Sequence, residues 1–269
     1  MSETALNVTS TREQELTWRE QLASGTPDRA LAAYLRFGPE EAGVQRGLED
    51  LSNVMSLVRS KSFNRAERIL QRLEERGAWF DWDAFEADLA RIREASAHID
   101  ERKLDEAHAL LDQVGMSMFA AEIANMRGTA RIFSGDLDEA RLDFETALEL
   151  DPQHYRALTN LGNAALEAGE LDEAIAYYER AIRLNGDFPN AHHNLGVAWR
   201  KKGKIGKSIS SLKSGQKAQQ RYEQAEAREQ LGRMGRNFGG SNSRKYLKWL
   251  MYGVVAVGVY WFLTSRGTI

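Results

Sequence analysis

The chain has 269 residues with 4 Pro, no Cys and a formal net charge of −3 at pH 7. The absence of cysteine excludes disulfides, thiol nucleophiles and cysteine-bearing zinc or iron–sulfur sites. A low proline content with abundant Ala, Leu, Glu and Arg is typical of packed helices, so we expect an all-α fold.

The first part of the chain is predicted to form helical pairs after a short disordered start. Residues 1–9 are polar and contain no apolar segment of the kind that a secretory signal peptide requires. Two helical pairs are expected over residues 10–76. Gly25 and Pro27 mark the turn of the first pair, because Gly favours a helix end and Pro a helix start. The second pair is expected at residues 39–60 and 62–76.

An aromatic insertion interrupts the helical pattern at residues 77–84. Four aromatic residues gather there and directly after it: Trp79, Phe80, Trp82 and Phe85. One interpretation is a packing plug that covers a bend in the chain, and the other is an exposed aromatic surface for a protein partner. We favour the plug and expect the next helix to begin at Phe85.

A repeated string then organises the middle of the chain. The sequence LDEA starts at Leu104, Leu137 and Leu171, at spacings of 33 and 34 residues. Residues 155–188 read as two short amphipathic helices that are separated at Gly169. Each pair leaves an apolar surface that only neighbouring pairs can bury, so the units are expected to stack. Gly162 is predicted to let a neighbouring helix approach closely.

These residues resemble the tetratricopeptide repeat (TPR) family, whose pattern places Gly, Ala and an aromatic residue at fixed positions. The central copy matches through Leu161, Gly162, Gly169, Ala174, Tyr178 and Ala181. The copy before it keeps Gly128, Gly135, Ala140, Phe144, Ala147 and Pro152, and the copy after it keeps Leu195, Gly196, Trp199 and Gly203. The resemblance implies a TPR-type α-solenoid, a right-handed superhelix of helical hairpins. It assigns TPR repeats to residues 85–219 and makes residues 10–76 degenerate TPR-like pairs.

The resemblance also implies a binding site, because the first helix of each repeat lines a concave groove in this family. The predicted groove residues are Glu122, Asn125, Met126, Thr129, Arg156, Thr159, Asn160, Asn163, Asn190, His193, Asn194 and Val197. Asn side chains donate and accept hydrogen bonds at once, which suits an extended or helical segment of another protein. The alternative is that these Asn residues serve hydrogen bonds between repeats.

The composition changes from acidic to basic after the last repeat. Residues 1–199 carry a net charge of −15, whereas residues 200–248 hold fourteen Lys or Arg against three Glu. A capping helix is predicted at residues 220–234 and a basic flexible hinge at residues 235–245. We expect anionic lipid headgroups to contact Lys201, Lys202, Lys204, Lys207, Arg244, Lys245 and Lys248. Nucleic acid is the disfavoured partner, since no aromatic residues interleave the basic run at residues 200–207.

The last segment is predicted to span a membrane. Residues 249–265 carry no charge and are flanked by aromatic residues at both ends. As a helix they would extend roughly 25 Å, close to the ~30 Å of a hydrocarbon core. We therefore predict a transmembrane tail anchor at residues 246–265. The preceding basic residues place the repeats in the cytoplasm and the short C-terminus on the far side. A bacterial inner membrane is favoured, with the mitochondrial outer membrane as the alternative.

No pattern in the sequence indicates an enzyme. The five histidines lack metal-binding spacing, and no phosphate-binding or nucleophile motif occurs. We therefore expect no catalytic residue, no metal and no cofactor. The favoured function is a membrane-tethered TPR scaffold that binds a protein segment in its groove and helps to assemble or localise a complex at the cytoplasmic face. The alternatives are a structural subunit of a larger membrane assembly and a mitochondrial outer-membrane-type adaptor.

Overall fold

The protein is all-helical in the computed structural model, which describes residues 18–37, 42–73 and 77–238. These residues contain no strand. A short helix covers residues 18–23. It is followed by α2 (Pro27–Phe37), α3 (Ala42–Arg59), α4 (Phe63–Leu70), α5 (Trp82–Asp100), α6 (Leu104–Leu111), the 3-10 turn η1 (Ser117–Phe119), α7 (Ala120–Ser134), α8 (Leu137–Leu150), α9 (Tyr155–Ala168), α10 (Leu171–Leu184), α11 (Pro189–Lys201) and α12 (Ile205–Phe238).

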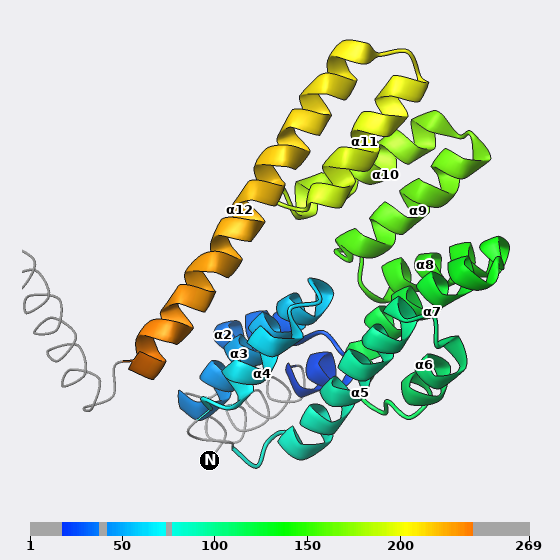
Figure 1. Cartoon of the computed structure of the whole chain (residues 1–269). Coiled ribbons are helices and arrows are strands. Elements are labelled where there is room, and N and C mark those ends of the chain that lie inside the picture. Colours follow the sequence, from blue (N-terminus) through cyan, green and yellow to red (C-terminus); the bar gives the residue numbers. More distant parts are fainter. Residues whose placement is uncertain (1–17, 38–41, 74–76, 239–269) are drawn as a thin grey trace, which may run out of the picture.

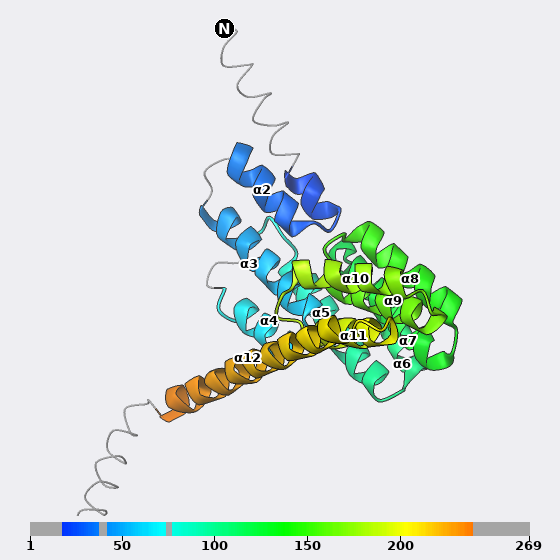
Figure 2. The same cartoon turned by 90° about the horizontal axis from the view of Figure 1, so that it is seen from above.

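The helices of the described residues fall into six consecutive pairs that stack as a TPR-like solenoid. Figure 1 shows α7 to α12 following one another in chain order along an arc, with α2, α3 and α4 gathered beside α5. Figure 2, in which the molecule is turned by 90° and seen from above, shows α12 running out along one edge of the molecule. Helical pairs were predicted for residues 10–76 and TPR repeats for residues 85–219, and the structure has helical pairs in both stretches.

Three glycines set the close packing within the last three pairs. Gly128, Gly162 and Gly196 lie 34 residues apart, each on the first helix of its pair. A Cβ atom at these positions would stand only 2.6 Å from Phe144, 2.6 Å from Tyr178 and 2.7 Å from Leu212, all side chains of the second helix. The predicted role of Gly162 in close approach is confirmed, because only hydrogen fits between the two helices.

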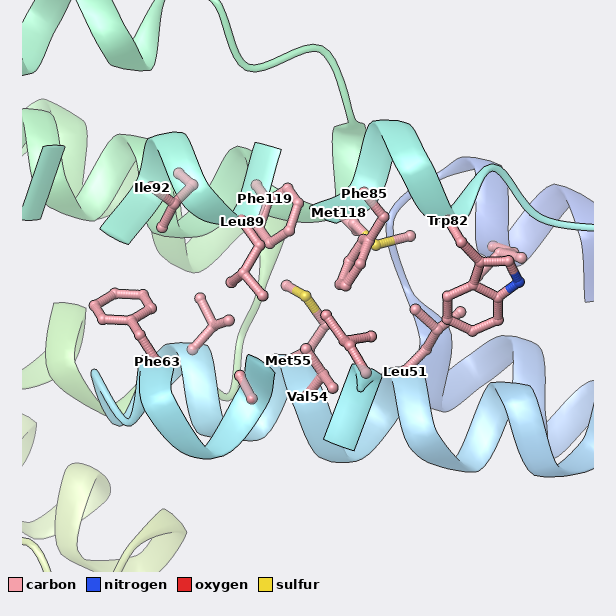
Figure 3. Packing of buried hydrophobic residues seen from close by; sticks show 14 of the residues in the cluster. Leu51, Val54, Met55, Phe63, Trp82, Phe85, Leu89, Ile92, Met118 and Phe119 are labelled. Carbon is pink, nitrogen blue, oxygen red and sulfur yellow. The ribbon is translucent and has the colours of Figure 1, made fainter. Parts of the chain in front are cut away.

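The N-terminal pairs share one large hydrophobic core. Figure 3 shows Leu51, Val54 and Met55 of α3 facing Phe85 and Leu89 of α5. Met118 and Phe119 close this core from the side of η1, and the rings of Phe85 and Phe119 stack with centroids 5.1 Å apart. This single core differs from the small clusters of the later pairs.

The aromatic insertion is packed as a plug on this core. Trp82 and Phe85 are buried, and the half-buried Trp79 and Phe80 contact them ring to ring. Trp79 also meets the ring of Trp18 with centroids 6.0 Å apart. These contacts agree with the packing interpretation of the insertion.

Two predicted boundaries are corrected by the structure. Helix α5 begins at Trp82 instead of Phe85, because the carboxylate of Asp81 accepts a hydrogen bond from the backbone N–H of Ala84 and caps the helix. Helix α12 runs without a break from Ile205 to Phe238. It therefore replaces the separate capping helix at residues 220–234 and includes residues 235–238 of the predicted hinge, whose remaining residues lie outside the described part of the chain. No Pro interrupts this stretch, so nothing forces the helix to end earlier.

Several predictions fall outside the described residues. They are the disordered start at residues 1–9, the anchor at residues 246–265, and the basic residues Arg244, Lys245 and Lys248. Among the helices that the structure does describe, none combines the length and the apolar character needed to cross a membrane.

Candidate functional site

A row of asparagine side chains links the first helices of three successive pairs. Asn160 of α9 donates from Nδ2 to Oδ1 of Asn125 on α7 at 3.0 Å. Asn194 of α11 donates from Nδ2 to Oδ1 of Asn163 on α9 at 2.7 Å, and the hydroxyl of Tyr178 donates to the same oxygen at 2.7 Å. We call Asn125, Asn160, Asn163 and Asn194 the amide row. Its hydrogen bonds join one repeat to the next, which is the alternative role that the sequence left open.

The amide row still has hydrogen-bonding groups to offer. An Asn amide carries two N–H donors and one carbonyl oxygen. Asn160 and Asn194 each use one N–H in the row, and both side chains are half-buried and reachable from solvent. One N–H and the carbonyl oxygen of each therefore remain for a ligand.

Four of the predicted groove residues lie too deep to contact a partner. Glu122, Asn125, Met126 and Thr159 are at most 4% exposed. Met126 belongs to the core that the N-terminal helices share, and the hydroxyl of Thr159 donates to the backbone of its own helix. Their burial removes these four residues from the surface that a partner can reach.

The accessible part of the predicted groove lies on α9 and α11. Asn190 and His193 are exposed, and with Gln216 and Gln219 of α12 they border a cavity of about 300 Å³. Spacings of three and four residues put Asn190, His193 and Asn194 on one side of α11. We call Asn160, Asn163, Asn190, His193 and Asn194 the α9–α11 face. Thr129, Arg156 and Val197 are half-buried.

A buried polar cluster lies at the other end of the predicted groove. The carboxylate of Glu122 accepts from Arg156 at 3.0 Å and contacts Nε2 of His154 at 3.0 Å. Nδ1 of His154 accepts from the backbone N–H of Ala157, so the ring proton is assigned to Nε2, which donates to Glu122. Sequence reasoning missed His154 altogether, because no periodic signal marks it as a partner of Glu122.

Charge compensation keeps Glu122 ionised in this cluster. Burial alone raises the pKa of a carboxyl group, but the Arg156 guanidinium and the hydrogen bond from His154 outweigh that effect and lower the pKa of Glu122 below its ordinary value. A buried carboxylate with two such partners stabilises the junction between α7 and α9. The Glu122 carboxylate already has protein partners and needs no ligand to compensate its charge.

The cluster adjoins the contact between the N-terminal helices and the repeats. Arg59, at the end of α3, pairs with Asp151 at 3.0 Å and with Asp28 at 3.5 Å. The hydroxyl of Tyr155 donates to the backbone carbonyl of Arg59 at 3.3 Å. A cavity of about 170 Å³ remains here, bordered by Arg59, Glu122, His154 and neighbouring residues. These contacts hold α3 against the start of α9.

The described basic residues of the predicted membrane surface lie around the last interhelical turn. Lys201, Lys204 and Lys207 are exposed, and the ammonium group of Lys207 lies 4.1 Å from the ring centroid of Trp199. Lys202 is half-buried and forms an ion pair with Asp172. Contact of these residues with lipid stays a prediction.

Within the described part of the chain, no group of three or more His, Cys, Asp or Glu side chains is arranged to hold a metal ion.

Comparison with protein families identifies the centre of the chain. A sequence model of the tetratricopeptide repeat matches residues 125–189. These residues are tetratricopeptide repeats. The matched TPR segment runs from the middle of α7 to the start of α11 and contains Asn125, Asn160 and Asn163 of the amide row.

Similar solved structures include two other helical proteins. A crystal structure of MamA is 19% identical, with 63% of this chain and 95% of that chain covered and a TM-score of 0.42. The crystal structure of YrrB, described as "a TPR protein with an unusual peptide-binding site", is also 19% identical, with coverages of 66% and 88% and a TM-score of 0.40. No functional residue is transferred from either protein at these values. Among curated proteins, none matches the chain.

Proposed function

We propose that the chain is a TPR scaffold that binds a segment of another protein on the α9–α11 face. The observation that carries the proposal is the combination of exposed Asn190 and His193 with the unused amide groups of Asn160 and Asn194. These groups lie on the first helices of two adjacent repeats, which the amide row holds in register. No catalytic role is assigned to any residue.

The chemistry of the face suits a peptide backbone. Each free amide can accept from a backbone N–H and donate to a backbone C=O, which fits an extended segment or a helix end with open groups. Apart from His193, the α9–α11 face holds no titratable group. Capture of the segment is therefore expected to persist when the salt concentration rises, because neutral hydrogen bonds are not screened.

We further propose that residues 246–265 anchor this scaffold in a membrane, with the repeats in the cytoplasm. Support comes from the uncharged stretch at residues 249–265 and from the basic residues that precede it. A bacterial inner membrane is the favoured location. Tethering confines the scaffold and its partner to one surface and raises their local concentration, which helps a complex to assemble.

The binding face is tested by paired variants in a crosslinking pull-down with the full chain. Asn190→Ala with His193→Ala removes exposed groups of the face and leaves the amide row intact. The matched control is Glu179→Ala with Arg183→Ala, two exposed residues of α10. We expect capture of the partner to fall in the first variant and to be unchanged in the control. Equal capture by both variants moves binding away from this face.

Extraction experiments test whether the chain is anchored in the membrane and whether it is a structural subunit of a larger assembly. Full-length protein is expected to stay in the membrane pellet at alkaline carbonate and to be released by detergent, as an integral span requires. A chain that is released by carbonate alone has no such anchor. If the protein purifies in detergent with fixed amounts of other subunits even after Asn190→Ala with His193→Ala, the structural-subunit alternative replaces the scaffold.

A further inference from the structure

Helix α12 is longer than its packing partner requires. It has 34 residues, whereas α11 has 13, so it extends about 51 Å as a straight helix. Figures 1 and 2 both show its second half leaving α11 along one edge of the molecule. Residues 219–225, where the helix passes its contact with α11, are all exposed.

The exposed side of α12 carries a row of cations. Lys213, Lys217, Arg221 and Arg228 are separated by four, four and seven residues, which places them on one side of the helix. We call these four residues the basic stripe. All four are exposed, and Arg221, which also pairs with Asp187, keeps 62% of its side chain in solvent.

The side of α12 that packs on α11 lies opposite the stripe. Ser208 and Ala218 are buried there, and a Cβ atom at Gly215 would stand 3.2 Å from His192. Gly215 is two residues from both Lys213 and Lys217, about 200° around the helix. Glu223, two residues from Arg221, is likewise turned away, and its carboxylate accepts from Gln219 at 2.8 Å. Glu223 therefore does not offset the attraction of an anionic surface to the stripe. Asp187, which precedes α11, is the carboxylate that pairs with a stripe residue, Arg221.

We propose that the basic stripe binds anionic lipid headgroups and fixes the angle at which the repeats stand on the membrane. The inference rests on the proposed tether. Only ten residues separate the end of α12 from the uncharged stretch that begins at Trp249, so an anchor there carries the stripe close to the headgroups. Each basic residue near such a surface strengthens binding by about fivefold.

Because α12 is one unbroken helix, lipid contact at the basic stripe fixes the orientation of the repeats relative to the membrane. A hinge directly after the last repeat would let the repeats rotate freely above the membrane. In the structure, α12 packs along α11 and continues as the same helix through the stripe. Lipid contact along the stripe therefore sets the position of α11, and with it the α9–α11 face.

The absence of cysteine permits a direct test in the full chain. A single spin label is attached at Gln224→Cys, which lies between Arg221 and Arg228 on the stripe, or at Gln219→Cys, five residues away and about 140° around the helix. Both glutamines are exposed, so neither change removes a charge or a core contact. The protein is reconstituted into vesicles of phosphatidylcholine alone or with added phosphatidylserine, and collisions with an aqueous nickel chelate are measured.

The label at residue 224 is expected to lose most of its collisions when phosphatidylserine is present, and high salt should restore them. The label at residue 219 should stay accessible in both vesicles. Lys213→Gln with Lys217→Gln and Arg228→Gln should abolish the protection. The same number of neutralised cations on the repeat body, at the exposed Lys103, Arg180 and Arg183, should leave it unchanged.

Two results would overturn the proposal. Equal accessibility of both labels on anionic vesicles, in protein that resists carbonate extraction, would show that the tether holds and the stripe does not bind lipid. Loss of duplex DNA binding in the stripe variant, with residue 224 still accessible on vesicles, would make the stripe a nucleic-acid surface instead. Release by carbonate is a separate outcome, because it removes the tether on which the proposal rests.

Discussion

The two halves of the solenoid bury their apolar residues in different ways. In the N-terminal region (residues 18–119), the helices share one continuous core that includes Trp82, Phe85 and Phe119. In the repeat region (residues 120–218), Met126 and Ala130 of α7 join that core, and the other clustered buried residues form four small groups, each between neighbouring helices. The N-terminal region thus behaves as a globular cap, whereas each later repeat depends on the next one.

The two regions also differ in the role that we expect of them: the N-terminal region packs and supports, and the repeat region binds. The N-terminal region uses large aromatic side chains to fill its core, and its polar surface forms no row comparable to the amide row among the hydrogen bonds of the described residues. The repeat region uses Gly128, Gly162 and Gly196 to bring helices together and leaves amide groups on the first helices. A partner surface is therefore expected on the repeats, and the N-terminal region is expected to support them.

The largest expected effect is on the shared N-terminal core. Phe85→Ala removes a ring that is fully buried and stacked on Phe119, and should lower the free energy of unfolding by about 4 kcal/mol. Chemical denaturation of the full chain measures the loss. Leu142→Ala, at a side chain that is 61% exposed, is the control and should change it by less than about 0.5 kcal/mol. Similar losses in the two variants would mean that no shared core exists.

The buried polar cluster between α7 and α9 should be nearly as sensitive. Glu122→Gln removes the buried carboxylate that pairs with the half-buried Arg156, and breaking such a charge pair costs about 3 kcal/mol. The same denaturation measurement at neutral pH detects the loss. A variant as stable as the parent would show that the cluster adds nothing to the contact between α7 and α9.

Acid should act on the same carboxylate. Because the pKa of folded Glu122 is lowered, its carboxylate stabilises the fold at pH values above the ordinary carboxyl pKa of about 4.3. That stabilisation is lost as the pH falls through the lower pKa of the folded state. The Glu122→Gln variant should therefore lose less stability than the parent between neutral pH and pH values below about 4. Parallel acid titrations of unfolding would contradict this assignment.

A smaller and more local effect is expected within one repeat. A Cβ atom at Gly162 would stand 2.6 Å from the ring of Tyr178, so Gly162→Ala should cost about 2 kcal/mol through overpacking. Hydrogen exchange should show α9 and α10 opening more easily while α3 and α5 keep their protection. Gly186→Ala is the control, since the nearest atom there is 3.8 Å away. Uniform loss of protection along the chain would argue against neighbour-by-neighbour stability.

The smallest expected effect concerns the start of α5. Asp81→Ala removes the side chain that caps this helix and should cost about 1 kcal/mol. Asp83→Ala, in the first turn, removes only a favourable helix-dipole contact and should cost about 0.3 kcal/mol. Thermal unfolding distinguishes the two variants. The reverse order would place the cap at Asp83 instead.

The repeat period made much of the fold predictable from the sequence. The LDEA spacing and the glycines gave the helical pairs and the close contact at Gly162, because local periodicity encodes both. The burial of Met126 could not be predicted in the same way. It results from docking of the N-terminal helices, whose contacts such as Tyr155 with Arg59 join residues 96 positions apart. Such contacts leave no periodic signal.

The candidate site, like the fold, could be predicted from the sequence only in part. The sequence marked Asn160, Asn163 and Asn194 as members of one surface, and the structure links each of them to an asparagine of a neighbouring repeat. It did not reveal that these bonds consume part of their hydrogen-bonding capacity. Nor did it reveal that the more freely exposed groups would be Asn190 and His193. Side-chain pairing across repeats depends on the stagger of the helices, which spacing alone does not fix.

Site-specific photocrosslinking tests the central claim most directly. A photoreactive residue is placed in the full chain, in cells, at His193 on the α9–α11 face, at Glu179 on α10, or at Glu49 on α3, all exposed positions. We predict a discrete crosslinked partner from position 193 that disappears when Asn190→Ala is added, and none from positions 179 and 49. The claim is contradicted if position 193 yields no partner, or if positions 179 and 49 capture the same protein with equal yield.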